Sequence, residues 1–169
     1  ADAVAEQPSR WLSLGHARPA RARDGPAGQA ALHLAEPGPL TAAGIMVMEL
    51  PIPPRVALLA CASGADYRFD EATGLVAAAI LGGAVLVTAT LWSLPTTAGY
   101  RRFCGAPSES ADPMAEVVVA VDTAHEANEA GRAVNAWQRA QLTRWRTGDV
   151  TASPLYWAAL ATFAVDGAR

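Results

Sequence analysis

The sequence predicts an α/β domain of three layers, in which a mostly parallel sheet is covered by helices on both faces. Three apolar runs, Arg10 to Gly15, Val56 to Ala60 and Ala84 to Trp92, are nearly continuous in hydrophobic residues, which is typical of strands buried on both sides. Helical patterns separate the later runs, so crossover connections can join neighbouring strands. The length of 169 residues suits a single domain over residues 1–169.

Composition and charge limit the classes of protein to which the chain can belong. Of its residues 51% are hydrophobic and 17% are charged, so the chain can bury a core and is not intrinsically disordered. The net charge of −3 gives no general attraction to nucleic acid or to an anionic membrane. The two cysteines, Cys61 and Cys104, are too few for a disulfide-stabilised secreted module. No signal segment opens the chain, which starts without methionine, and we expect a cytoplasmic domain of a longer protein.

The N-terminal third is expected to contain short elements separated by loops. Residues 17–29 are rich in proline, glycine and arginine and form a loop, and a short strand follows over Ala30 to Ala35. A turn is expected at Glu36 to Pro39. Thr41 then caps a helix that continues to Met48.

An uncharged run, Leu75 to Leu91, allows two interpretations. A transmembrane helix needs about 20 apolar residues, and this run is slightly short. Gly82 and Gly83 lie at its middle, with alanine-rich sequence before them and β-branched sequence after them. This order favours a buried helix over residues 70–81, a glycine turn and a buried strand.

The second half is expected to be mainly helical. Residues 95–104 form a short helix, and Asp112 and Pro113 start a long helical region, because a capping side chain precedes a proline. This region extends to Arg146 and is broken near Gly131.

The C-terminal apolar segment LYWAALATFAV follows Ser153 and Pro154 and is expected to form a strand. Three tryptophans of this half are expected to anchor the core: Trp137, Trp145 and Trp157.

Two of the apolar strands end at residues with catalytic chemistry. His16 follows the first strand and Cys61 the second, and in an open parallel sheet ligands bind beyond the carboxyl ends of the strands. If the strands are neighbours, the imidazole and the thiol lie at one edge of the sheet, about 5 Å apart. A nearby histidine is the usual base that generates a nucleophilic thiolate. In caspases an alanine-cysteine-x-glycine pattern follows such a histidine by about 50 residues, and here Cys61, in ACASG, follows His16 by 45.

The segments around these residues resemble CHAT domains, which are caspase-like relatives of separase among the cysteine peptidases. The resemblance is carried by WLSLGHA at His16, LTAAGI at Leu40 and ALLACASG at Cys61, and continues through DEATGLVAAAILGGAVLVTATLWSLPTTAGYRRF, AVNAWQRAQLTRW and SPLYWAAL. It covers almost the whole chain in the order of the family. It implies a caspase-like fold whose N-terminal strands are missing here, and a fused or associated helical-repeat region that senses a partner.

The resemblance also implies a site for peptide-bond cleavage. His16 takes the role of general base and Cys61 that of nucleophile, while the backbone N–H groups of Cys61 and Ala17 hold the oxyanion. The family usually has glycine at the position of Ala17, and alanine would strain the loop by roughly 1 kcal/mol if that position needs positive φ. Six further residues are candidates for the substrate pocket: Ser63, Gly64, Asp66, Trp92, Ser93 and Thr96.

Separase relatives carry acidic residues after the third strand, and these favour a basic P1 side chain in the substrate. The corresponding stretch here, Ser93 to Thr97, has no acidic residue. The sequence therefore predicts a neutral or apolar P1 side chain.

The remaining histidines and the second cysteine are expected to be structural. We expect His33 on a half-exposed strand, His125 at a solvated position of a long helix, and Cys104 in a packing role. The cysteines and histidines show no spacing typical of metal ligands, so no metal and no cofactor are expected.

Two functions of different classes fit these observations. The first is a cysteine endopeptidase, a hydrolase that acts on a polypeptide substrate and has neither nucleic acid nor membrane as a partner. The alternative is a catalytically inactive caspase-like module for protein interaction, which Ala17 and the short N-terminus favour.

Overall fold

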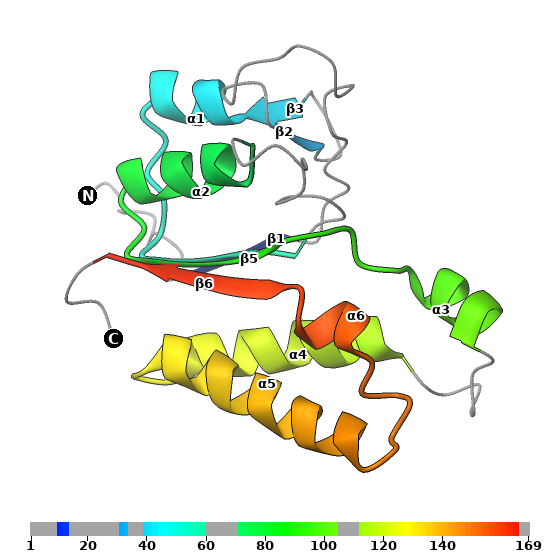
Figure 1. Ribbon diagram of the computed structural model, residues 1–169. Coiled ribbons are helices and arrows are strands. Elements are labelled where there is room, and N and C mark those ends of the chain that lie inside the picture. Colours follow the sequence, from blue (N-terminus) through cyan, green and yellow to red (C-terminus); the bar gives the residue numbers. More distant parts are fainter. Residues whose placement is uncertain (1–9, 14–30, 34–38, 60–70, 105–111, 166–169) are drawn as a thin grey trace, which may run out of the picture.

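A four-stranded sheet forms the centre of the computed structural model (Figure 1). Its strands are β1 (Arg10–Ser13), β4 (Arg55–Leu58), β5 (Leu86–Thr90) and β6 (Leu160–Ala164), in the order β1-β4-β5-β6. β4 pairs in parallel with both β1 and β5, whereas β6 is antiparallel to β5. The chain thus has the mixed α/β fold that the sequence predicts. The structure describes residues 10–13, 31–33, 39–59, 71–104 and 112–165.

Two helices, α1 (Ala42–Val47) and α2 (Glu71–Leu81), cover one face of the sheet (Figure 1). α1 starts where the sequence predicts, because the Thr41 side chain accepts a hydrogen bond from the Gly44 N–H at 2.8 Å. A side-chain cap of this kind satisfies one of the backbone donors that a helix leaves open at its start.

The turn between α2 and β5 requires its two glycines for different reasons. Gly83 has a φ of 115°, and the Ala84 N–H donates to the Ala79 carbonyl, which is the main hydrogen bond of a Schellman motif. At Gly82 a Cβ atom would lie 2.5 Å from Cγ1 of Ile52. The uncharged run is therefore a buried helix, a glycine turn and a strand. In the described part of the chain, no helix has the length and apolar character needed to cross a membrane.

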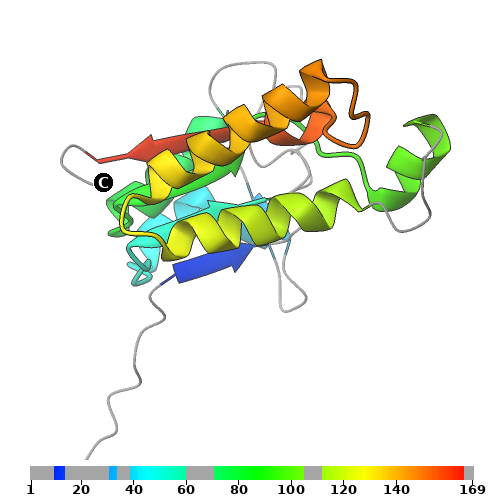
Figure 2. The same ribbon diagram turned by 90° about the horizontal axis from the view of Figure 1, so that it is seen from below.

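The opposite face of the sheet is covered by α4 (Pro113–Glu126) and α5 (Ala130–Arg146), which lie side by side (Figure 2). Two shorter helices complete this half of the molecule. α3 (Thr97–Cys104) lies beyond one end of the sheet, and α6 (Pro154–Trp157) packs against both α4 and α5 (Figure 1).

The start of α4 is correctly predicted, and the break between the long helices is displaced by a few residues. Asp112 caps α4, and Pro113 occupies its first turn. The interruption falls at residues 127–129, so Gly131 lies inside α5 rather than at the break.

Alternate residues of the central strands point into two separate cores. Val56 of β4 and Val87 of β5 pack with α1 and α2, whereas Ala57 of β4 and Leu160 of β6 pack with α4, α5 and α6. All five residues of β5 are buried, as expected of a strand that is covered on both faces.

Two short strands, β2 (Ala31–His33) and β3 (Pro39–Thr41), form a separate antiparallel pair. The sequence predicts β2, but it predicts a turn at Glu36 to Pro39 instead of β3. A strand of three residues is too short to show an alternating pattern, so the sequence gives no sign of it.

The C-terminal apolar segment is a helix followed by a strand, and the prediction of one strand is wrong. The Ser153 side chain accepts a hydrogen bond from the Leu155 N–H, and Pro154 occupies the first turn of α6. β6 starts only at Leu160. A cap followed by proline is the same signal that marks the start of α4, so the sequence did contain a sign of α6.

His125 is buried, which contradicts the solvated position that the sequence predicts. Only 3% of its surface is exposed, and its Nε2 lies 2.8 Å from Oγ1 of Thr88 in β5. Thr88 Oγ1 also lies 3.3 Å from Oγ1 of Thr162 in β6. Glu126, the next residue, is exposed because it lies on another face of α4. A charged neighbour in the sequence therefore does not show whether His125 is exposed or buried.

The tryptophans differ in burial. Trp137 packs against the core formed by α4, α5 and α6. Trp157 is half-buried, and its Nε1 donates to the Ala152 carbonyl at 2.9 Å. Trp145 is 42% exposed, so the prediction that it anchors the core is wrong.

A polar cluster occupies the region near Trp145 where an apolar core was expected. Arg144 Nη1 donates to Glu116 Oε1 at 2.6 Å, Gln141 Nε2 donates to the same oxygen at 2.9 Å, and Arg144 Nε donates to Asp149 at 2.9 Å. Hydrogen bonds from Thr151 and Arg144 lower the pKa of Asp149. These side chains join α4, the end of α5 and the following turn.

The buried bond between Thr88 and His125 makes a prediction about stability. Thr88→Val should lower the free energy of unfolding by about 1–3 kcal/mol, because it deprives a buried imidazole of a partner. Thr162→Val is the matched control on the next strand, and it should cost less than about 1 kcal/mol, because its longer contact does not reach the imidazole. Urea denaturation of both variants measures the two losses. Equal losses would contradict this role of Thr88.

Candidate active site

The strands that precede His16 and Cys61 are neighbours in the sheet. β1 and β4 pair in parallel, and Ser13, the last residue of β1, is in register with Leu58, the last residue of β4. His16 and Cys61 each follow these paired residues by three positions in the sequence. The two strands therefore lead toward the same edge of the sheet, where parallel α/β sheets bind ligands.

Most of the residues expected in the site lie outside the described residues. These are His16, Ala17, Cys61, Ser63, Gly64 and Asp66. The structure describes the other three candidates, Trp92, Ser93 and Thr96, which follow β5 at the carboxyl edge of the sheet.

The strand that leads to Cys61 is held at its other end by an arginine. Arg55 is the first residue of β4, and its Nη1 donates to the carbonyl oxygens of His125 and Ala127, the latter at 2.7 Å. These carbonyls lie at the C-terminal end of α4, where the last carbonyls have no partner within the helix. One guanidinium thus caps α4 and fixes the helix to the strand.

Trp92 is part of a fixed wall at this edge of the sheet. Its Nε1 donates to the Leu155 carbonyl in α6 at 3.0 Å, and the Leu91 N–H donates to the Ala159 carbonyl at 2.7 Å. The indole is half-buried and packs against the adjoining core together with the buried Leu94. We expect such a side chain to shape a pocket by its position, since its polar atom is already bonded.

The two candidate hydroxyl groups differ in how they are used. Thr96 is exposed, but its Oγ1 accepts a hydrogen bond from the Gly99 N–H at 3.1 Å and so caps α3. Ser93 is exposed beside Trp92. Ser93 is therefore the better placed of the two to contact a ligand.

Two tyrosines that are not among the predicted site residues, Tyr100 and Tyr156, hold α3 against the wall. Tyr100 is buried, its ring meets that of Tyr156 edge-to-face with centroids 5.8 Å apart, and its hydroxyl donates to the Val150 carbonyl at 3.3 Å. Edge-to-face pairs of this kind add stability beyond the area that they bury. The sequence did contain a sign of this contact, because Tyr100 is an aromatic residue within the short helix that is predicted over residues 95–104.

Asp112 ties the start of α3 to the start of α4. Its Oδ1 accepts hydrogen bonds from the Ala115 N–H at 3.1 Å and from the Thr97 hydroxyl at 2.9 Å. The pKa of Asp112 is lowered, chiefly by the Ala115 N–H and further by Thr97 and the nearby Arg101, although partial burial opposes the effect. The carboxylate form is thus the one that the fold stabilises.

The segment that follows β5 carries basic charges only. Residues 91–104 contain no acidic side chain, and α3 carries Arg101 and Arg102 in its last turn. Among the residues that the structure describes, no three His, Cys, Asp or Glu side chains lie close enough to hold a metal ion.

The lowered pKa of Asp112 predicts how stability depends on pH. A carboxyl with a lower pKa in the folded state adds stability that is complete above its unfolded pKa of about 3.9 and is lost as the pH falls through the folded value. Asp112→Asn retains a capping oxygen, so between about pH 5 and pH 2 this variant should lose less unfolding free energy than the wild type. Asp112→Ala should lose about 1 kcal/mol at neutral pH. Identical pH profiles for the wild type and Asp112→Asn in urea denaturation would contradict this role of the carboxylate.

Comparison with known proteins identifies the family. Residues 14–167 match the family model of the CHAT domain, which covers most of the chain. No curated protein matches the chain. The extent of the family match confirms the resemblance that the segments around His16 and Cys61 indicate. The chain belongs to the CHAT-domain family.

Proposed function

We propose that this CHAT domain is a cysteine endopeptidase in which Cys61 is the nucleophile and His16 the general base. The observation that carries the proposal is the register of β1 and β4, in which Ser13 is opposite Leu58. His16 and Cys61 follow this pair at equal distances along the chain. Neighbouring strands are about 5 Å apart, so this arrangement supports a thiol and an imidazole within reach of one another.

In this mechanism His16 removes the thiol proton of Cys61, and the thiolate attacks the carbonyl carbon of the scissile bond. The N–H groups of Cys61 and Ala17 donate to the oxyanion of the tetrahedral intermediate. The protonated His16 gives its proton to the leaving amine, the C–N bond breaks and a thioester remains. Water, deprotonated by His16, then hydrolyses the thioester and releases the thiol. A thiolate nucleophile requires reduced cysteine, which suits the cytoplasm.

The substrate of the proposed peptidase has a neutral or apolar P1 side chain. An acidic group that would bind a basic P1 residue is absent from residues 91–104. Trp92 supplies a fixed apolar wall and Ser93 an exposed hydroxyl. Ser63, Gly64 and Asp66 are proposed to complete the pocket.

The proposal includes a caspase-like arrangement of three layers and control by a helical-repeat region. Contacts of α1 and α2 with one face of the sheet, and of α4 and α5 with the other, support the layered arrangement (Figure 1). The family resemblance supports a fused or associated helical-repeat region that responds to a partner.

Substitution of the two catalytic residues tests the mechanism. Cys61→Ser should remove nearly all turnover, because an alcohol is much harder to deprotonate than a thiol near neutral pH. His16→Ala should also remove most of it, and the double variant should add little, since residues that act as a unit are not additive. Cys104→Ser is the control and should change the rate by no more than about threefold. The rates are measured on fluorogenic casein, and an unchanged rate for Cys61→Ser would contradict the peptidase proposal.

Ala17→Gly tests whether alanine strains the oxyanion loop. Glycine should raise kcat and leave KM unchanged, because the N–H donor acts mainly on the transition state. The alternative function, an inactive module for protein interaction, is favoured by the presence of alanine at this position. If neither the wild type nor Ala17→Gly shows turnover in the presence of the helical-repeat region, the inactive module is the correct function.

A further inference from the structure

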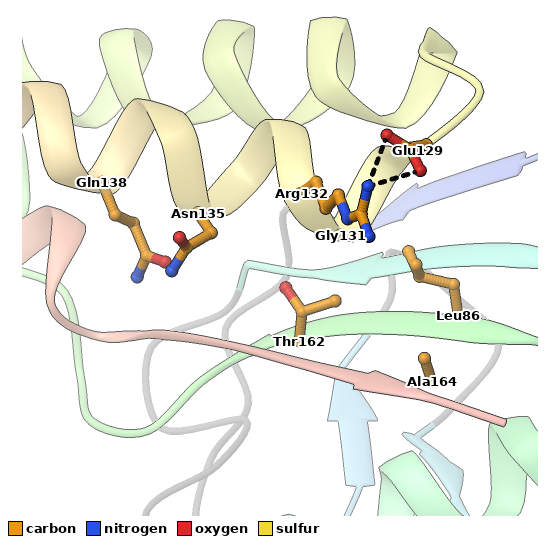
Figure 3. A pocket seen from close by; sticks show the side chains of 8 residues that line it. All are labelled: Leu86, Glu129, Gly131, Arg132, Asn135, Gln138, Thr162 and Ala164. Carbon is orange, nitrogen blue, oxygen red and sulfur yellow. Dashed lines mark hydrogen bonds and ion pairs between the residues drawn. The ribbon is translucent and has the colours of Figure 1, made fainter. Parts of the chain in front are cut away.

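A groove lies between α5 and β6, on the side of the sheet away from β1 (Figure 3). We call it the β6 groove. Its volume is about 470 Å³. Figure 3 shows Asn135 and Gln138 pointing from α5 toward the strand, and Thr162 pointing back toward the helix. The lining includes the charged pair Glu129 and Arg132, together with Gly131, Asn135, Thr162 and Ala164.

β6 directs part of its backbone away from β5, along the outer edge of the sheet that borders the groove. The Leu91 N–H donates to the Ala159 carbonyl, and the Val165 N–H donates to the Val85 carbonyl. In an antiparallel pair such bonds occur at every second residue, so the N–H and C=O groups of the even-numbered residues of β6 point outward. Within the described part of the chain no further strand pairs with this outer edge.

One outward carbonyl of β6 is already bonded by a side chain. Gln138 Nε2 donates to the Leu160 carbonyl at 3.0 Å and to the Trp157 carbonyl at 2.8 Å. This bond covers the start of the outer edge. The backbone groups of Thr162 and Ala164 are the ones that remain beside the groove.

The sequence of β6 has none of the features that protect an exposed edge. Edge strands are usually protected by charged side chains, proline or a bulge. β6 reads LATFA, without charge or proline, and its five residues pair with β5 without interruption. An edge of this composition is open to pairing with another segment.

The charge beside the groove indicates the chemistry of that segment. α5 contains four arginines and no acidic residue. Arg132 is bonded to both oxygens of Glu129. A second hollow shares Gly131, Arg132 and Asn135 with the β6 groove, and the exposed Arg139 also lines it. In the part of the chain that the structure describes, no carboxylate forms an ion pair with Arg139. One cationic side chain therefore remains to bind an acidic partner.

A second copy of the chain fits the edge less well than an acidic peptide. A symmetric antiparallel pair centred on Thr162 would place Leu160 opposite Ala164 of the partner copy, and Gln138 already occupies the Leu160 carbonyl. It would also bring α5 of each copy, which contacts β6 and carries four arginines, toward one interface, and like charges oppose association. A short acidic segment that pairs only with Thr162 and Ala164 meets neither obstacle, because it does not need the Leu160 carbonyl and adds no positive charge.

From this geometry we infer that the β6 groove binds a short, extended, acidic peptide, which adds a strand to the outer edge of β6 at Thr162 and Ala164. Backbone hydrogen bonds supply the affinity in strand addition, and side-chain pockets supply the specificity. The bound peptide would lie across β6 from the first half of β5, because Ala164 is opposite Leu86. Peptide binding at this edge is a function separate from the proposed peptidase activity.

Fluorescence anisotropy with two labelled hexapeptides tests the inference on the full chain. The acidic probe is fluorescein-EVTVEV-amide, and the control probe is fluorescein-KVTVKV-amide. The acidic probe should bind at least about tenfold more tightly, because only its charges complement Arg139. Equal binding of the two probes, or no binding of the acidic probe up to about 1 mM, would overturn the inference.

Two variants separate backbone pairing from charge. Ala164→Pro removes one outward N–H without breaking a bond to β5 and should weaken binding by about tenfold. Arg139→Glu should weaken it by a similar factor, whereas Arg146→Glu, the same charge change at the exposed end of α5, should leave it within about twofold. Circular dichroism checks that the variants are folded. Equal effects of Arg139→Glu and Arg146→Glu, or a concentration-dependent dimer that Ala164→Pro abolishes in sedimentation, would show that an acidic peptide is not the occupant.

Discussion

The complete burial of β5 is the constraint on which the rest of the structure depends. All five of its residues are buried, and a strand buried on both faces requires a helical layer on each side. Val87 and Ala89 face the core of α1 and α2, while Thr88 faces α4. Because β4 and β5 run in parallel, a crossover helix must connect them, and α2 with its glycine turn is that helix. The same parallel arrangement brings the carboxyl ends of β1, β4 and β5 to one edge, where a catalytic site can form.

Burying Thr88 at the centre of the sheet creates a need for polar partners, and α4 supplies them. His125 bonds to the Thr88 hydroxyl, and its own backbone carbonyl accepts from Arg55 of β4. Buried polar groups that lack partners are costly, so this set of bonds specifies where α4 lies relative to the sheet. A hydrophobic helix could slide along an apolar face, whereas these directional bonds fix its position. The position of β4, which leads to Cys61, is fixed with it.

Local signals in the sequence predict the elements of this fold better than they predict its buried polar contacts. The caps at Thr41 and Asp112 and the glycine turn at Gly83 are properties of neighbouring residues, and each is where the sequence places it. The burial of His125 depends on Thr88, which lies 37 positions earlier, and no local pattern reveals that pairing. The positions of His16 and Cys61 could be proposed because both follow apolar strands and match a family motif. The β6 groove has no motif at all, since it arises only when α5 packs beside a strand that follows it in the sequence.

The candidate active site and the β6 groove lie at different parts of the sheet, yet both are attached to the segment that contains α6. On one side, Trp92 and Leu91 bond to the carbonyls of Leu155 and Ala159. On the other, Gln138 bonds to the carbonyls of Trp157 and Leu160. α6 has only four residues, and a single helical turn has little stability of its own, so these tertiary bonds determine where it lies. A segment held from both sides in this way makes the wall of the site and the edge of the groove parts of one packed unit, and the geometry of either depends on the bonds that hold the other.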